Sequence, residues 1–137
     1  VHDGMDIGCF KLDKGSMELL FSGALMRCMV LRDGKLTLLD CSRNSLGGHM
    51  PHLQKEFNQA RFQLRPGDRI MLSTDGYQSQ FGGAHGKKMK AHEFRALLER
   101  THGLSAAQAV VFLESEFAHW RGDEEQIDDV LVVILDV

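Results

Sequence analysis

The stretch RIMLSTDGYQSQFGG, from Arg69 to Gly83, begins as an apolar run and stops abruptly at Asp75-Gly76. The apolar run predicts a buried strand with an acidic residue at its end. A carboxylate in that position is costly unless another group offsets its charge. One carboxylate binds little by itself, so a functional role for Asp75 requires a second acidic site elsewhere in the chain.

A second acidic segment, DEEQIDD at 123–129, leads into the apolar run VLVVILDV at 130–137. This continuous run predicts a central strand that is buried on both faces. If the two apolar strands are antiparallel neighbours, Asp75, Asp128 and Asp129 gather at one edge of a sheet.

Gathered carboxylates repel one another unless a cation lies between them. Mg²⁺ and Mn²⁺ prefer oxygen ligands, and a metal-bound water is a ready nucleophile for hydrolysis. Taken separately, the two segments are better explained as a solvated turn and a solvated acidic loop. Taken together, with both adjoining the most apolar strands, they favour a metal site.

The first 40 residues predict an antiparallel meander. The segments 6–13 and 17–23 have the alternation of strands, and 27–40 has two apolar runs around Asp33-Gly34, a dipeptide suited to a tight hairpin turn. Two further short strands are expected within 61–74, around the turn Pro66-Gly67-Asp68.

The second half of the chain predicts helices. Residues 91–100 place Phe94, Leu97 and Leu98 on one stripe, and 105–120 opens with Ser105 and Gln108 in capping-box spacing. The segments 41–60 and 82–90 predict a connection and a mobile, basic, glycine-rich loop. This order indicates an α+β layered sandwich, forming one domain or part of one.

Composition excludes several classes of protein. With 137 residues, 43% hydrophobic, the chain can form one modest core. A net charge of −3 and a pI near 6.2 argue against nucleic acid as the main partner. No apolar run is long enough for a membrane span, and no signal peptide is recognisable. Cys9, Cys28 and Cys41 predict buried, reduced thiols in a cytoplasmic protein.

Several segments, in order along the chain, resemble one known family. They are DGMDIGCFKLD, LLFSGALMRCMVLRDGKL, LGG at 46–48, LRPGDRIMLSTDGYQSQFGG with GKKMK, and QIDDVLVVIL. The chain is similar to the metal-dependent protein serine/threonine phosphatases (PPM-type, protein phosphatase 2C-like) in their bacterial SpoIIE-like branch. The resemblance implies that residues 1–137 are the C-terminal half of a four-layer α-β-β-α sandwich with antiparallel sheets.

The resemblance also implies a site. Asp75 and Asp128 correspond to catalytic metal ligands of a two-metal Mn²⁺ or Mg²⁺ centre, and Asp129 and Gly76 adjoin them, with Asp129 orienting a ligand or water. The family's ions bridge a water that attacks phosphoserine or phosphothreonine. Its earlier Gly-Asp motif and a further acidic segment are missing here, and Asp3 and Asp6 match a later segment and receive no ligand role.

The remaining polar residues give weaker signals. Lys87 and Lys88 suit a phosphate or an acidic partner surface, and a solvated basic loop explains them equally well. His49, His52 and His85 fit no zinc spacing, so solvated loop histidines are the favoured interpretation.

Two functions follow as expectations. In the first, a longer parent dephosphorylates a regulatory protein of the STAS-domain anti-sigma-antagonist type in partner-switching signalling, and this segment needs the upstream half, or a second copy, for completion. In the second, the chain is a non-catalytic phosphatase-fold module that binds such a partner. Either function places this segment in the cytoplasm without membrane contact, and a membrane tether of the parent is left open.

Overall fold

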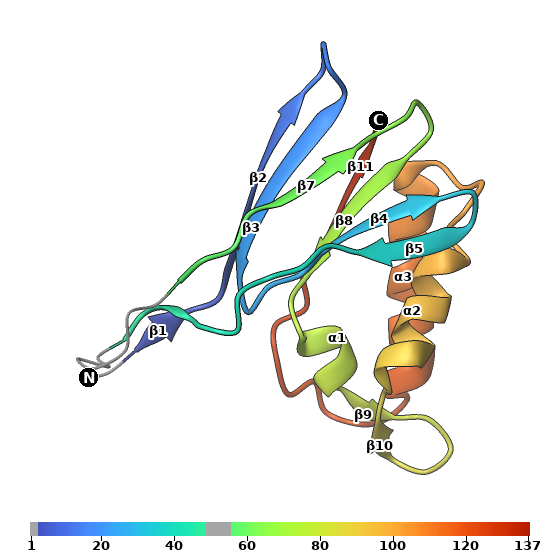
Figure 1. Cartoon of the computed structure of the whole chain (residues 1–137). Helices are drawn as coiled ribbons and strands as arrows, with labels where there is room; N and C mark the ends of the chain where they lie inside the picture. The colour runs from blue at the N-terminus through green and yellow to red at the C-terminus, as the bar shows by residue number, and fades with distance from the viewer. Residues whose placement is uncertain (1–2, 49–55) are drawn as a thin grey trace.

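The computed structural model describes residues 3–48 and 56–137 and shows three layers: a sheet, a second sheet and a pair of helices (Figure 1). The first sheet has the order β2-β3-β7 and the second β11-β8-β4-β5, with every neighbouring pair antiparallel. The strands are β2 (Ile7–Asp13), β3 (Glu18–Ala24), β4 (Cys28–Arg32), β5 (Lys35–Leu38), β7 (Ala60–Gln63), β8 (Arg69–Ser73) and β11 (Val132–Asp136).

Two helices cover the outer face of the four-stranded sheet, α2 (Ala91–Glu99) and α3 (Ala106–Arg121). The shorter elements are β1 (Gly4–Met5), β6 (Leu46–Gly47), α1 (Gly76–Ser79), β9 (Phe81–Gly82) and β10 (Lys87–Lys88). The predicted α+β sandwich with antiparallel sheets is confirmed, and the described residues form its β, β and α layers.

Strand β8 lies at the centre of the packing because both of its faces are buried. Ile70 and Leu72 join the core between the two sheets, whereas Met71 joins the core between the sheet and the helices. Successive side chains of a strand point to opposite faces, so one apolar run fills two cores. Leu19 and Phe21 of β3 and Val30 of β4 complete the first core, as the alternation predicted.

The predicted turns have the expected backbone geometry. Asp33 and Gly34 both have positive φ, 50° and 75°, in a two-residue hairpin turn between β4 and β5. Gly67 has a φ of 91°, and the Asp68 N–H donates to the Arg65 carbonyl, as in a type II turn with proline in second position. Both predictions are confirmed.

The predicted helices are confirmed as well. Phe94, Leu97 and Leu98 are the buried residues of α2. In α3, the Ser105 side chain accepts from the Gln108 N–H and the Gln108 side chain accepts from the Ser105 N–H, so the capping box is present.

The prediction that the last strand is central and buried on both faces is wrong. Strand β11 is an edge strand, paired only with β8 among the described residues. Val132 and Ile134 pack toward the helices, while Val133 and Leu135 on the opposite face are 42% and 37% exposed. The three-stranded sheet does not cover this part of the four-stranded sheet, so the apolar run is buried on one face only.

Three smaller expectations also change. The segment 82–90 is not an irregular loop, because β9 pairs with β10 in a short hairpin. The connection 41–60 contributes β6, which pairs with β1. All three cysteines are free thiols, but only Cys28 is buried and Cys9 is exposed.

An ion pair between half-buried Arg32 and buried Asp68 fixes the turn between β7 and β8. Arg32 donates to both oxygens of Asp68, from Nε at 2.8 Å and from Nη2 at 2.6 Å, and the Arg65 N–H donates to the same carboxylate. Burial alone would raise the pKa of Asp68, but the Arg32 guanidinium and the Arg65 N–H offset it, so this pKa lies below its ordinary value.

We expect Asp68→Asn to lower the free energy of unfolding at pH 7 by roughly 2–3 kcal/mol, because Arg32 then loses a buried charged partner. A depressed folded-state pKa stabilises the fold above the unfolded value of about 4, and this stabilisation disappears as the pH falls through the folded-state pKa. The difference between wild type and variant should therefore shrink at pH 3 in urea titrations.

The matched control is Glu18→Gln, which removes the exposed ion pair with Arg61. An exposed pair of this kind contributes less than about 1 kcal/mol. An Asp68→Asn effect no larger than this control, or one independent of pH, would contradict the proposed role of the Arg32–Asp68 pair.

Candidate metal centre

The pairing of β8 with β11 brings the two acidic segments together. Ser73 lies opposite Val132 at the end of the ladder, and the contact continues beyond it. The Thr74 N–H donates to the Leu131 carbonyl at 3.0 Å, the Leu131 N–H donates to Thr74 Oγ1, and Thr74 Oγ1 donates to the Asp129 carbonyl at 3.1 Å. The predicted antiparallel neighbours are confirmed, and Thr74 joins the two segments.

Gly76 permits a close backbone approach at the same place. A Cβ on Gly76 would lie 2.2 Å from the Asp129 carbonyl oxygen, well inside van der Waals contact. Only glycine fits here without displacement of the Asp129 backbone. Gly76 thus allows Asp75, directly before it, to lie beside the Asp128-Asp129 segment.

The carboxylates themselves are exposed to solvent. Asp75 precedes α1 and its side chain does not cap that helix. Hydrogen bonds hold both the side chain and the backbone of Asp128. Its Oδ1 accepts from the Asp129 N–H at 2.8 Å, and its carbonyl accepts from Gln126 Nε2 at 2.9 Å. In the described ranges, no ion pair to a lysine, arginine or histidine neutralises Asp75, Asp128 or Asp129.

The donor chemistry suits Mg²⁺ or Mn²⁺, since these oxygen ligands are exposed and carry no protein counter-charge. The number of donors is smaller than predicted: within residues 3–48 and 56–137, no three His, Cys, Asp or Glu side chains are grouped closely enough to hold a metal. The backbone gathers the acidic segments at one edge, whereas the three side chains do not converge. Among the described residues the chain therefore gathers acidic segments but does not form a three-ligand metal group.

Tyr77 anchors the segment that follows Asp75. Its hydroxyl donates to the Leu113 carbonyl of α3 at 2.9 Å, and its ring packs against Phe94 and Phe117 with centroid distances of 4.7 and 5.0 Å. Because Tyr77 is fixed to both long helices, the position of Asp75 depends on the helical layer as well as on the sheet.

Gln80 is a positioning residue that the sequence did not reveal. It is fully buried, and its Nε2 donates to the Glu125 carbonyl at 2.9 Å, which ties the end of α1 to the acidic segment. Trp120 Nε1 donates to the Gln80 carbonyl at 3.0 Å. A glutamine between a serine and a phenylalanine gives no sequence signal of burial. Thr74 was not predicted as a positioning residue either, although its place directly before Asp75 could have indicated that role.

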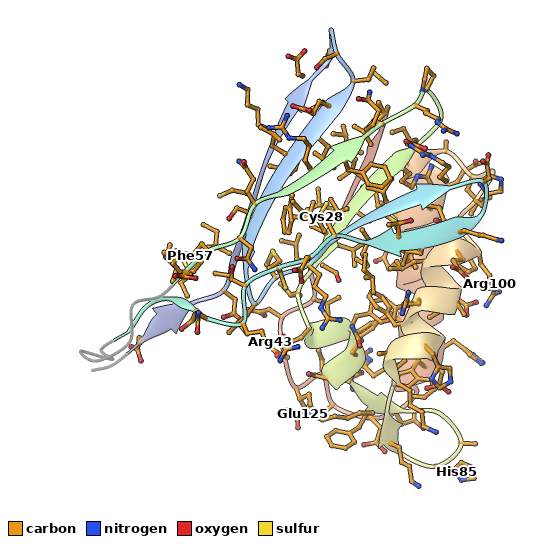
Figure 2. All side chains as sticks on the ribbon, in the orientation of Figure 1. Cys28, Arg43, Phe57, His85, Arg100 and Glu125 are labelled. Atoms are coloured by element: carbon orange, nitrogen blue, oxygen red, sulfur yellow. The ribbon has the colours of Figure 1, made fainter. Side chains whose placement is uncertain are left out.

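The weaker candidates lie on the β9–β10 hairpin. Lys87 and Lys88 are exposed, and Lys88 Nζ lies 5.5 Å from the centroid of the Phe81 ring. Figure 2 shows His85 at the outer end of this hairpin, away from the sheets, while Glu125 lies near its base. Nothing in the described contacts brings these lysines to Asp75, and His49 and His52 lie outside the described residues.

The fold and the paired acidic strand ends define a phosphatase-like domain of the protein phosphatase 2C class. A family model described as Stage II sporulation protein E (SpoIIE) matches residues 4–137. The chain therefore belongs to the SpoIIE family, as the sequence resemblance implied.

Solved structures share the fold. The SiaA PP2C domain of Pseudomonas aeruginosa is 24% identical with a TM-score of 0.87, covering 96% of this chain and 51% of its own length. The SpoIIE phosphatase domain of Bacillus subtilis is 15% identical, with a TM-score of 0.67 and coverage of 96% and 57%. The serine/threonine phosphatase PstP of Mycobacterium tuberculosis is 20% identical, with a TM-score of 0.65 and coverage of 98% and 60%.

The chain thus spans about half to three-fifths of the length of these structures, in agreement with the half-domain that the resemblance implied. A comparison with curated protein sequences finds no significant match. None of the described helices is long and apolar enough to cross a membrane.

Gly76→Ala tests the close approach. Alanine favours helices over glycine, so propensity alone predicts a small gain of stability in α1. We expect the opposite, a lower melting temperature and faster hydrogen exchange at the Leu131 N–H, because the new Cβ displaces the Asp129 carbonyl.

The control is Gly15→Ala in the β2–β3 turn, where the added Cβ meets only the Asp13 side chain, at 3.3 Å. If Gly76→Ala preserves both the melting temperature and the exchange rate at Leu131, the two segments do not touch as described.

Proposed function

We propose that this chain is the C-terminal part of a metal-dependent phosphatase that hydrolyses phosphoserine or phosphothreonine on a partner regulatory protein. The observation that carries the proposal is the junction of Thr74 and Gly76 with Asp129 and Leu131, which places two acidic segments at one sheet edge. Membership of the SpoIIE family supports the reaction type.

In this proposal Asp75 and Asp128 hold Mn²⁺ or Mg²⁺, and Asp129 orients a ligand or water. Bound ions of this kind supply an activated water and neutralise the phosphoryl oxygens. The chain's own residues fix the ligands: Gln126 holds the Asp128 backbone and Thr74 holds that of Asp129. No thiol is needed, and burial raises the pKa of Cys28 to about 12, so this buried cysteine stays protonated.

Two of the open sheet edges, those of β2 and β11, support a need for further polypeptide. Strand β2 pairs only with β3, and β11 only with β8, among the described strands. A Cβ on Gly8 would lie 3.0 Å from Leu72 Cδ2, so this part of β2 packs over the end of β8, the neighbour of β11. Exposed strand edges with apolar neighbours invite pairing.

An apolar groove adjoins the β11 edge. It encloses about 440 Å³ between α3 and β11, and its walls include Val110, Leu131 and Val132. Val110 and Leu131 are 48% and 56% exposed, so the groove leaves apolar surface open to a partner. We propose that the upstream half of the domain covers this side, and that a second copy of the chain does so in its absence.

The proposed substrate is a phosphorylated regulatory protein, of the STAS-domain anti-sigma-antagonist type that the family resemblance implies. The exposed Lys87 and Lys88 offer positive charge to such a protein on a hairpin separate from the carboxylates. In this proposal the segment works in the cytoplasm, on Mn²⁺ or Mg²⁺, without contact to nucleic acid or membrane.

A non-catalytic, partner-binding module is the second candidate. The observation that favours it is the lack of a three-ligand group among the described residues. The two candidates differ in whether the complete domain turns over a phosphorylated peptide.

We expect the isolated 137-residue chain to have negligible phosphatase activity and to self-associate. Its two assigned ligands cannot hold two hydrated ions, and its open edges and apolar groove remain uncovered. Hydrolysis of a phosphoserine peptide with Mn²⁺ and sedimentation velocity at micromolar concentration measure both properties. Robust metal-dependent turnover by a stable monomer would contradict the proposal that the chain needs further polypeptide to complete its metal site.

In the complete domain, Asp128→Asn should abolish most activity and most of the Mn²⁺-induced rise in melting temperature. Stabilisation by a ligand follows its affinity for the folded state, so a weakened site gives a smaller shift. In chelator this variant should melt no lower than wild type, because the loss of one carboxylate relieves repulsion with Asp75.

Asp129→Asn is the matched comparison, because it removes the neighbouring carboxylate of the same exposed segment before β11. It should cost about tenfold in activity, as changes next to metal ligands do. A solvated acidic loop predicts that neither variant changes the Mn²⁺ shift, and a wild-type shift in Asp128→Asn shows that Asp128 is not a ligand.

A further inference from the structure

A second cavity lies beside Asp75, on the helical side of the sheet. It encloses about 270 Å³ between the β3–β4 connection, the end of β8 and the first turns of α2. Its lining includes buried apolar side chains and exposed charged ones: Met29, Phe94, Arg27, Asp75 and Arg95. Since Met29 and Phe94 are buried and the three charged residues are exposed, the cavity has an apolar floor and a charged rim.

The two rim arginines are free to bind a ligand. No hydrogen bond or ion pair occupies the guanidinium of Arg27 or Arg95 within the described ranges. By contrast, four other arginines of the chain are paired with carboxylates: Arg32, Arg61, Arg69 and Arg100. A guanidinium presents a planar fork of donors that matches a carboxylate or a phosphate.

Two further features define the ligand's character. Ala91, the first residue of α2, lies on the cavity wall, where Glu93 of the same turn already accepts from the Lys90 N–H, so the positive charge at the rim comes from the two arginines. Leu25 on the same wall is 48% exposed and has a positive φ of 59°. An exposed leucine held in this uncommon conformation offers an apolar contact at the rim.

We propose that this cavity binds the substrate polypeptide next to its phosphorylated residue, with Arg27 and Arg95 holding a carboxylate side chain of that segment. The inference rests on the proposed function, because it takes Asp75 as a metal ligand and therefore places the phosphoryl group nearby. The charge of the two arginines selects an anion, and the apolar floor with Leu25 selects a peptide over a free inorganic ion. Arg27 and Arg95 would then determine which residues next to the phosphoserine or phosphothreonine the enzyme prefers.

The test compares two phosphoserine peptides that differ only by Glu or Gln at the positions flanking the phosphoserine. The complete wild-type domain with Mn²⁺ should show a kcat/KM about tenfold higher for the Glu peptide, as a charge-assisted pair supports. In the double variant Arg27→Gln/Arg95→Gln this ratio should fall to about one. The ratio is measured within each enzyme, so a general loss of activity cancels.

Arg65→Gln is the matched control, because Arg65 is an exposed arginine at the opposite end of β8. It should keep the wild-type ratio. A ratio near one in the wild type, or an unchanged ratio in the double variant, overturns the proposal. An equal drop in the Arg65→Gln control also overturns it, because the preference then reflects general charge.

A binding measurement separates this inference from the proposed function. Fluorescence anisotropy of the labelled Glu and Gln peptides, with the 137-residue chain in chelator, needs no catalysis. If the complete domain hydrolyses neither peptide, the proposed function fails, while tighter binding of the Glu peptide that Arg27→Gln/Arg95→Gln removes still supports the cavity. Equal binding of both peptides, with displacement by inorganic phosphate, indicates a site for free phosphate and overturns the inference.

Discussion

The pairing of β8 with β11 is the constraint on which the candidate site depends. These strands are distant in sequence, and their antiparallel register sets Ser73 opposite Val132. One residue beyond the end of β8, Thr74 forms hydrogen bonds with the Leu131 backbone and with the Asp129 carbonyl. A shift of one residue in this register would turn the side chains of β11 to the opposite face and move Asp128 away from Asp75.

The layers around β8 fix this register. Ile70 and Met71 are fully buried in different cores, so β8 cannot rotate or slide without exposing apolar surface on one side. At the other end of the two strands, buried Arg69 binds Asp136 as well as the Thr101 and Leu104 carbonyls. The Arg69 guanidinium holds the pKa of Asp136 below its ordinary value. The ladder is thus tied to the α2–α3 connection at one end and to α1 and α3, through Tyr77, at the other.

The sequence predicted those parts of the structure that have a local cause. Asp33-Gly34 and Pro66-Gly67 specify their turns through backbone preferences, and the Ser105–Gln108 box specifies a helix start. The neighbourhood of Asp75 and the 128–129 pair was also predictable, since acidic residues follow one apolar strand and precede the other. Each of these features depends only on residues adjacent in the sequence or on the pairing of two strands.

Other features depend on tertiary context that a single sequence does not contain. An apolar run such as 130–137 looks the same whether one face or both are covered, and only the width of the opposing sheet decides that Val133 and Leu135 are exposed. Gln80 becomes a link to Glu125 because α1 ends against the acidic segment. The assignment of Asp75 and Asp128 as ligands stays a prediction, as does the role of Lys87 and Lys88.

Paramagnetic broadening by Mn²⁺ in the nuclear magnetic resonance spectrum of the complete domain tests the central claim most directly. At substoichiometric Mn²⁺, the amide signals of Asp75, Gly76 and Asp128 should broaden first, because the ion lies within reach of both acidic segments. Signals of the β2–β3 turn around Gly15, at the opposite end of the sheets, should stay sharp (Figure 1). Broadening that spares Asp75 and Asp128, or that is confined to the histidines, would contradict a metal centre at the junction of β8 and β11.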